Sequence, residues 1–390
     1  MAHVRWSDAT AREDIRHFAL QTCLAFSATE LWPSHPLDGT PTPNARRAAL
    51  YDGAGGVIWA LRHFAAIGLI DTPPDFSAAV KTLVARNREW ADLQDWQTPS
   101  YLLGDTGLLL LQWQYHPDSA LEDRLHDAIR SNLDHASQEA LWGNPGTAIA
   151  AIHMAEATGA ARWKQLVQQC VGHLDDSLET DPETGTPIWT QNLYGKRTRY
   201  LGAGHGMVGN TYVALRGSAL LDPSQVQRMA DGCLATLGAT ALRADGCANW
   251  HPMSDAVRVA NRVPPVQDCH GAAGVVNRLA IAPRTSEWDA LLSAAGELVW
   301  QAGPLAKGPG ICHGTAGNAL ALLKLAHRFQ DDVWLDRARA MALHASAQVR
   351  RQHTQYGQAR HALWTGDLGV AWVLWACMGA TPTIPTLDVF

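Results

Sequence analysis

Charged side chains are scarce in this sequence and are spread along its length. Asp, Glu, Lys and Arg make up 17% of the 390 residues, the formal net charge is −6, and neither sign forms a long run. Nucleic acids and anionic membrane surfaces bind through concentrated basic patches, so we expect neither as the main partner. No uninterrupted apolar stretch reaches the roughly 18 residues of a membrane span, and the N-terminal residues lack the apolar core of a secretory signal peptide.

Cysteine is also infrequent, and its number is odd. The chain has seven cysteines. Thiols stay reduced in the cytoplasm and pair in oxidising compartments, so an odd, modest number favours a cytoplasmic protein. Four cysteines lie in apolar helical contexts and are expected to be buried free thiols: Cys23, Cys170, Cys233 and Cys377.

Two of the remaining cysteines stand in the same short motif. The pattern C-H-G-x-A-G occurs at Cys269–Gly274 and again at Cys312–Gly317, 43 residues later. Zinc favours a tetrahedral set of Cys and His ligands, and a catalytic site keeps one of the four positions open. Two thiols and one imidazole would form such a Cys2His set with room for a substrate. The spacing does not decide whether His270 or His313 supplies the imidazole.

The doubled motif belongs to a longer series of glycine loops. A G-x-x-G pattern followed by an apolar run occurs seven times, with first glycines 39 to 65 residues apart. A recurrence of about 50 residues is typical of repeat architectures. The segments between these loops are amphipathic with a helical period, whereas the runs after the glycines are apolar nearly all round. The first glycines are Gly53, Gly104, Gly143, Gly206, Gly271, Gly314 and Gly366.

These two kinds of segment predict an all-α fold. Seven amphipathic outer helices that alternate with seven buried inner helices would form an α/α toroid, a double-layered barrel, over a single domain of residues 1–390. Glycine at each inner helix start would let backbones approach closely. It would also direct several helix N-termini, the positive ends of the helix dipoles, toward one cavity. The outer segments are expected at 11–26, 75–90, 121–133, 163–174, 223–237, 288–300 and 333–349.

Two long insertions interrupt the repeat. Residues 179–200 and 242–266 are rich in Pro, Gly, Asn and Thr, and we expect them to cross the cavity mouth. The first insertion carries a tight basic cluster, Lys196, Arg197 and Arg199. That cluster is either a solvated loop or a clamp for a substrate carboxylate or phosphate.

Several of the glycine loops carry motifs of a known family. Tyr200–Gly206 resembles an A-H-G loop, Gly310–Gly314 a C-H-G loop, and Gln267–Gly271 a W-C-x-G loop, while Leu103–Gly107 is similar to C-G-D-A-G. These are motifs of the lanthionine synthetase C-like family, the bacterial lanthipeptide cyclases and their eukaryotic glutathione-binding relatives. The resemblance covers nearly the whole chain, and it implies the same sevenfold α/α toroid.

The resemblance also implies the metal and its ligands. The cysteine of the fifth loop and the Cys-His pair of the sixth would bind Zn²⁺, which selects Cys269, Cys312 and His313 and leaves His270 nearby as a substrate-binding residue. The family often has Trp before the fifth-loop cysteine, where this chain has Asp268. That carboxylate would hydrogen-bond a ligand or weaken the binding of an anionic substrate.

Further residues receive roles from the same resemblance. His205 matches the active-site histidine and is expected to act as general acid/base. Glu139 lies where the family has an acidic residue and would position His205 or assist its proton transfer. Lys307 and Arg360 would bind a substrate carboxylate.

The function implied is the formation of carbon–sulfur bonds. A thiol activated by zinc would add to a dehydroalanine or dehydrobutyrine residue, either within a lanthipeptide precursor or from glutathione onto a dehydroamino-acid protein. A dehydratase or kinase is the expected partner. The alternative is a non-catalytic module that binds zinc and a thiol or peptide within a modification complex. An (α/α)-barrel carbohydrate enzyme would use paired carboxylates, whereas these loops carry cysteines.

Overall fold

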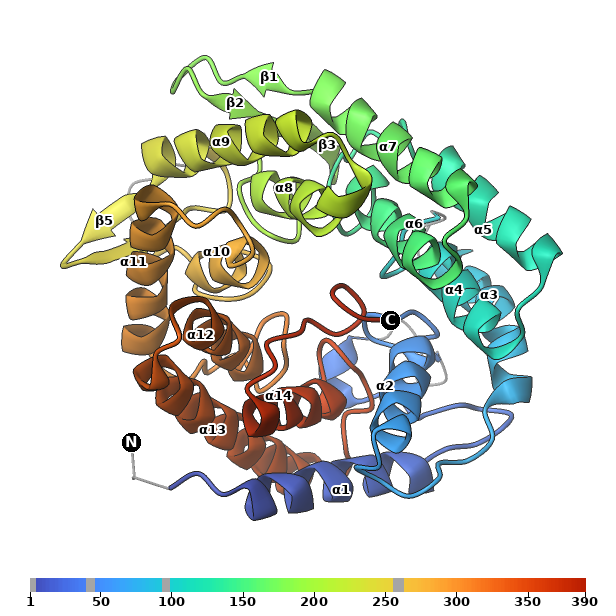
Figure 1. Ribbon diagram of the computed structural model, residues 1–390. Coiled ribbons are helices and arrows are strands. Elements are labelled where there is room, and N and C mark those ends of the chain that lie inside the picture. The colour runs from blue at the N-terminus through green and yellow to red at the C-terminus, as the bar shows by residue number, and fades with distance from the viewer. Residues whose placement is uncertain (1–4, 40–45, 93–98, 255–262) are drawn as a thin grey trace.

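The computed structural model describes residues 5–39, 46–92, 99–254 and 263–390. Within these ranges the chain forms fourteen α-helices, two 3-10 helices and six short strands. Figure 1 shows two concentric rings, with the even-numbered helices inside and the odd-numbered helices outside. Each inner helix contacts the next, and α14 returns to α2, so the inner ring is closed. The protein is an α/α toroid, which confirms the predicted fold class.

The inner helices begin where the sequence predicted. In all seven, the N-cap residue is the first glycine of the G-x-x-G loop. The glycine N-caps have no side chain to accept an amide, and in α10 the Asn249 side chain accepts the Ala272 amide at 2.9 Å instead. The inner helices are α2 (Ala54–Ala66), α4 (Asp105–Tyr115), α6 (Asn144–Thr158), α8 (Met207–Arg216), α10 (Ala272–Leu279), α12 (Thr315–Phe329) and α14 (Asp367–Gly379).

The second glycine of each loop is required by close backbone contact. A Cβ atom at this position would clash, in all seven loops, with the carbonyl oxygen of the residue six positions earlier. Only glycine lets the loop fold back so tightly onto its own helix. The glycines and the residues whose carbonyls they approach are Gly56 and Leu50, Gly107 and Tyr101, Gly146 and Ala140, Gly209 and Ala203, Gly274 and Asp268, Gly317 and Ile311, and Gly369 and Leu363.

This folding back also satisfies the first backbone amides of four inner helices. The first amide of α12, on Thr315, donates to the Gly308 carbonyl at 3.0 Å, and that of α14, on Asp367, donates to the Arg360 carbonyl at 3.0 Å. The first amides of α2 and α8 are satisfied by their own loops in the same way. These N–H groups are therefore not free to bind a ligand directly, and the positive potential expected from the helix N-termini at the cavity stays a prediction.

The outer helices are amphipathic and bury one face against the inner ring. In α5, for example, Leu121, Leu125 and Ile129 form the buried stripe, as the 3.6-residue period requires. Five outer helices begin at a Ser, Thr or Asp whose side chain accepts a first-turn amide. The outer helices are α1 (Asp8–Leu24), α3 (Ser77–Asp92), α5 (Ser119–Ser131), α7 (Ala161–Asp176), α9 (Pro223–Thr240), α11 (Ser286–Ala302) and α13 (Asp332–Tyr356).

The insertions form short antiparallel hairpins. The first insertion contains two hairpins and the second contains one, while residues 255–262 of the second lie outside the described part of the chain. Arg197, in the predicted basic cluster, lies 3.7 Å from Glu179 across the first insertion. The strands are β1 (Glu179–Thr180), β2 (Pro187–Ile188), β3 (Gln191–Leu193), β4 (Lys196–Thr198), β5 (Leu242–Ala244) and β6 (Cys247–Asn249), and the 3-10 helices are Pro36–Asp38 and Ser218–Leu220.

The segment after α14 turns into the centre of the ring (Figure 1). Asp388 accepts hydrogen bonds from Lys324 at 2.8 Å and from Tyr212 at 2.5 Å. His153 lies 3.1 Å from the carbonyl of Thr386, which is fully buried. Residues 384–390 thus pack against helices from opposite sides of the ring. None of the helices in the described ranges combines the length and apolar character needed to cross a bilayer.

Candidate metal centre and its cavity

A cavity of about 430 Å³ opens among the glycine loops. Such a volume is typical of a small-molecule or peptide side-chain site. Leu387, in the segment 384–390 that follows α14, contributes to its lining. Seven of the predicted site residues line it as well: His205, Asp268, Cys269, His270, Lys307, Cys312 and His313.

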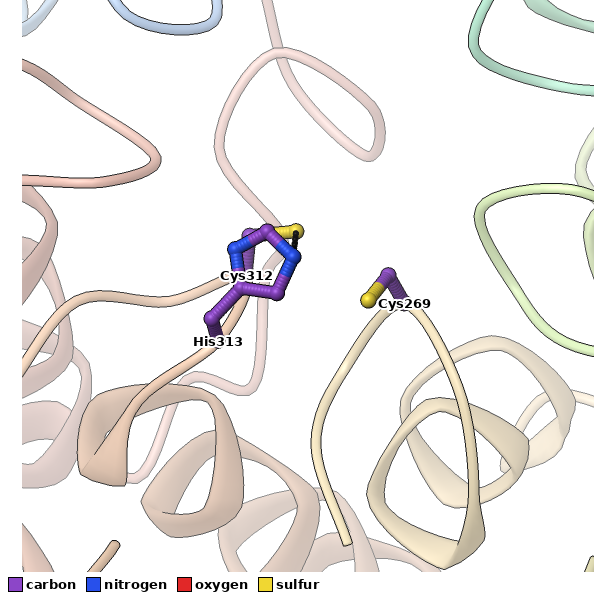
Figure 2. A group of neighbouring side chains, drawn as sticks. All are labelled: Cys269, Cys312 and His313. Carbon is purple, nitrogen blue, oxygen red and sulfur yellow. Dashed lines mark hydrogen bonds between the residues drawn. The ribbon is translucent and has the colours of Figure 1, made fainter. Parts of the chain in front are cut away.

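The predicted metal ligands converge at this cavity. One ligand atom from each of Cys269, Cys312 and His313 lies within 4.8 Å of the other two, and Cys312 Sγ is 3.8 Å from His313 Nε2. Figure 2 shows the Cys269 sulfur directed from the fifth loop toward the other two side chains, which both come from the sixth. Ligands of a tetrahedral zinc are about 3.5–3.8 Å apart, so the donor atoms and their spacing fit this metal.

The two ligand loops are tied together by their backbones. The Cys269 amide donates to the Cys312 carbonyl at 3.4 Å, and the Cys312 amide donates to the Trp364 carbonyl at 3.0 Å. Gly271, in the fifth loop, has φ of +100°, and a Cβ atom at this residue would clash with the Pro265 carbonyl. The spacing of the sulfurs is therefore set by backbone hydrogen bonds and by a residue that only glycine can supply.

Neighbouring side chains form hydrogen bonds with both sulfurs. Gln267 Nε2 donates to Cys269 Sγ at 3.0 Å, and Tyr51 hydrogen-bonds to Cys312. The hydrogen bond from Cys312 holds the pKa of Cys269 well below that of a free thiol, despite burial. One thiol of the pair therefore ionises readily, as a metal ligand must.

The structure separates the two candidate imidazoles. His313 lies with the cysteines, whereas the His270 ring lies 5.4 Å from the ring of His205 and 6.0 Å from that of Tyr200. Burial lowers the pKa of His270 to about 4, so this ring is neutral at physiological pH. His270 therefore lines the cavity between the cysteines and His205, where the sequence had placed it among the substrate-binding residues.

His205 and Glu139 form a buried pair. His205 Nδ1 lies 2.7 Å from Glu139 Oε2. The carboxylate also accepts the amides of Leu141 at 3.0 Å and Trp142 at 2.7 Å, which fixes its orientation. Burial alone would lower the pKa of His205, but the hydrogen bond and charge of Glu139 outweigh it and raise that pKa. The pair can thus hold a proton beside the cavity, as a general acid requires.

Asp268 forms a buried ion pair with Arg278. Its two carboxylate oxygens accept from the guanidinium of Arg278 at 3.1 and 2.9 Å, and one also accepts from Asn277 at 2.8 Å. All three residues are buried. Asp268 also lines the cavity. Its hydrogen bonds join the Cys269 loop to α10, the helix that follows, and a role of Asp268 in substrate binding stays a prediction.

The two predicted cationic residues lie in different places. Lys307 is exposed and lines the cavity near His270. Arg360 is absent from the described lining residues, because its Nε donates to Asp38 at 2.7 Å and its amide donates to Asp367. The structure thus brings Lys307 to the site and leaves Arg360 in an ion pair away from it.

Several lining residues were missed by the sequence reasoning, among them Tyr51, Tyr194, Gln267 and Arg278. Arg278 could have been noticed as a lone charge in the apolar run after the fifth loop, and Tyr194 as a non-glycine residue in a two-residue turn. Tyr51 and Gln267 carry no signal in a single sequence beyond their place next to a loop.

Comparisons with known proteins identify the family and the fold. The family model for "lanthionine synthetase C-like protein" matches residues 44–383. Glutathione S-transferase LANCL1 of Danio rerio is 44% identical over 73 residues, which are 18% of this chain and 18% of that protein. LanC-like protein GCL1 of Arabidopsis thaliana is 33% identical over 152 residues, 37% of this chain and 32% of that protein. The matched stretch is thus less than a third of the length of either relative.

A solved structure shares the fold. Nisin cyclase superposes with a TM-score of 0.61 over 85% of this chain and 89% of its own, at 12% sequence identity. An identity this low supports the α/α toroid and no more. The family model, by contrast, covers most of the sequence, and this chain belongs to the lanthionine synthetase C-like family.

Proposed function

We propose that this protein is a zinc-dependent enzyme that adds a thiol to a dehydroalanine or dehydrobutyrine residue. The observation that carries the proposal is the placement of two chemical groups in one cavity. Cys269, Cys312 and His313 line this cavity as a possible metal site, and His205, paired with Glu139, lines the same cavity. The family includes cyclases and a protein named glutathione S-transferase, and both names describe chemistry at a thiol.

The three ligands would hold zinc with its fourth position open to the cavity. Bound there, zinc would lower the pKa of an incoming thiol so that it is present as thiolate at neutral pH. The substrate sulfur would add to the β-carbon of the dehydroamino acid, and the electron pair of the double bond would move to the carbonyl oxygen as an enolate. His205 would then deliver a proton to the α-carbon, and Glu139 would stabilise the imidazolium before that transfer.

Two substrates fit this chemistry, and we favour the transfer of a separate thiol. Lys307 is an exposed cation at the cavity and offers a partner for a carboxylate of a glutathione-like thiol. Intramolecular cyclisation of a peptide remains the second candidate, supported by the shared fold of nisin cyclase.

A mass-spectrometric assay tests the proposal. The zinc-loaded protein is incubated with a dehydroalanine peptide and glutathione, and a product with the summed mass of both is expected. Cys312→Ala should lose both zinc and product, whereas Cys377→Ala, at a buried thiol in α14, should keep both. Full zinc content in Cys312→Ala would contradict the ligand assignment. Binding of thiol and peptide by wild type without product would favour the non-catalytic module.

We further propose that residues 1–390 form one domain, which the contact between α1 and α14 supports. The cytoplasmic location and the dehydratase or kinase partner remain predictions. All seven cysteines are free thiols in the structure.

A further inference from the structure

Tyr194 occupies a backbone position that a tyrosine seldom adopts. It lies with Gly195 in the two-residue turn that joins β3 to β4, where Leu193 pairs with Lys196. Tyr194 has φ of +53° and Gly195 has φ of +71°. Two positive φ values define a type I′ turn, in which Asn-Gly is strongly favoured because both residues tolerate the left-handed region. A side chain with no conformational reason to be there points to function.

The hairpin places this side chain at the cavity. Tyr194 is 63% exposed, yet it lines the cavity. Its ring meets that of His205 edge to face, with centroids 6.0 Å apart and an interplanar angle of 77°. The Trp142 indole N–H donates to the Tyr194 hydroxyl at 3.1 Å, and the same Trp142 donates its amide to Glu139. The phenol is thereby fixed to the segment that orients the His205–Glu139 pair.

The direction of that hydrogen bond leaves the phenol proton available. An indole N–H can only donate, so the Tyr194 oxygen accepts and its own O–H must be directed elsewhere. Within the described ranges, the Trp142 contact is the hydrogen bond that the hydroxyl makes. A free tyrosine keeps its proton at neutral pH. The neutral Tyr194 hydroxyl thus lies beside His205, the proposed proton donor, and its O–H is available to a substrate.

We propose that Tyr194 donates a hydrogen bond to the substrate carbonyl oxygen and stabilises the enolate that forms there. This inference rests on the proposed function. As the thiolate forms its bond to the β-carbon, the π electrons move onto the carbonyl oxygen, where the Tyr194 O–H meets the new negative charge. His205 then protonates the α-carbon and the carbonyl is restored, so Tyr194 keeps its proton throughout. A donor aimed at the charge that develops acts on the transition state more than on the bound substrate.

Two substitutions separate this role from packing of the hairpin. Tyr194→Phe keeps the ring and the backbone conformation and removes only the hydroxyl. Tyr194→Asn removes the phenol but introduces the residue that a type I′ turn favours. If Tyr194 only stabilises the turn, Tyr194→Asn should keep full activity. If Tyr194 donates a hydrogen bond to the substrate, Tyr194→Asn should lose activity while its thermal stability is equal to or greater than that of wild type.

The test measures kcat and KM for adduct formation, the zinc content and the midpoint of thermal unfolding. Tyr194→Phe should lower kcat by about 10- to 100-fold, at or below the usual cost of losing one oxyanion donor, with little change in KM. Zinc content should stay at the wild-type level in both variants. Tyr115→Phe is the control. Tyr115 is the last residue of inner helix α4, at the end opposite its glycine loop, and its ring lies against Arg62.

Three results would overturn the inference. They are a Tyr194→Phe variant as fast as wild type, a loss expressed only in KM, and a Tyr194→Asn variant that loses activity only because it loses zinc or unfolds. An inactive wild type would overturn the proposed function together with this inference, whereas an active wild type with an equally active Tyr194→Phe would overturn the role of Tyr194 alone.

Discussion

Alanine at the second glycine of a ligand loop should displace a metal ligand without touching it. In Gly274→Ala the new methyl group would meet the Asp268 carbonyl, and in Gly317→Ala it would meet the Ile311 carbonyl. Each of these carbonyls directly precedes a cysteine ligand. Because the obstacle is backbone rather than a flexible side chain, the loop itself must move, and the Cys269 or Cys312 sulfur must move with it.

The structure allows the size of the effect to be estimated. Overpacking of this kind costs about 1–3 kcal/mol. A chain of 390 residues has an unfolding entropy of roughly 0.8 kcal/mol/K, so the midpoint of thermal unfolding should fall by about 1–4 °C. The displaced sulfur should weaken zinc binding by about 10- to 100-fold, as does the loss of groups that orient a ligand. Both quantities are accessible, by calorimetry and by competition with a chromophoric chelator.

Matched variants separate the two effects. Gly107→Ala creates the same clash, with the Tyr101 carbonyl, in a loop that carries no ligand, so stability should fall and zinc affinity should not. Gly172→Ala, in α7, meets nothing within 4 Å and should stabilise the protein by about 0.5–1 kcal/mol. Equal zinc affinity in Gly274→Ala and wild type, or equal losses in Gly107→Ala and Gly274→Ala, would refute the argument that these glycines set the ligand spacing.

Two further predictions concern the acid and the cations. Glu139→Gln should lower the pKa of His205, because burial then acts without the opposing carboxylate, so the alkaline limb of the pH–rate profile should move to lower pH; an unmoved limb would exclude this pair. Since the raised pKa stabilises the fold fully below about pH 6.5 and this contribution disappears as pH rises through the raised value, the stability difference between wild type and Glu139→Gln should shrink with increasing pH. Lys307→Ala should raise KM for glutathione by roughly 2- to 5-fold, as befits an exposed charge pair, whereas Arg360→Ala should leave KM unchanged; the reverse pattern would contradict their placement.

The fold was predictable because its rules are local. Each inner helix starts directly after the first glycine of a loop whose second glycine must be glycine, so seven helix starts could be located from a spacing pattern. The ends of the outer helices were less accurate. Helix α13 runs to Tyr356, beyond the predicted 333–349, because its last two turns are largely polar and carry no apolar period to detect.

The site was predictable in part, because its residues come from loops that the repeat brings together. The shared C-H-G motif indicated both cysteines but could not choose the histidine, since His270 and His313 follow their cysteines identically. The family resemblance selected His313, and in the structure His313 lies with the sulfurs whereas the His270 ring lies beside that of His205. The position of Arg360 depends on Asp38, more than 300 residues away in the sequence, and no local pattern reports such a pairing.

The segment 384–390 determines how a substrate can reach the centre. A toroid with an open axis would be a channel, through which an extended peptide could thread from one face to the other. Here Leu387 lines the cavity, and Thr386 and Asp388 are hydrogen-bonded to helices around the ring. Among the described residues, the segment 384–390 therefore occupies part of the ring's axis. If the substrate is a peptide, as we propose, an extended chain would not pass straight along this axis, and residues in turns and flexible tails would reach the cavity more readily than residues in the middle of a straight chain.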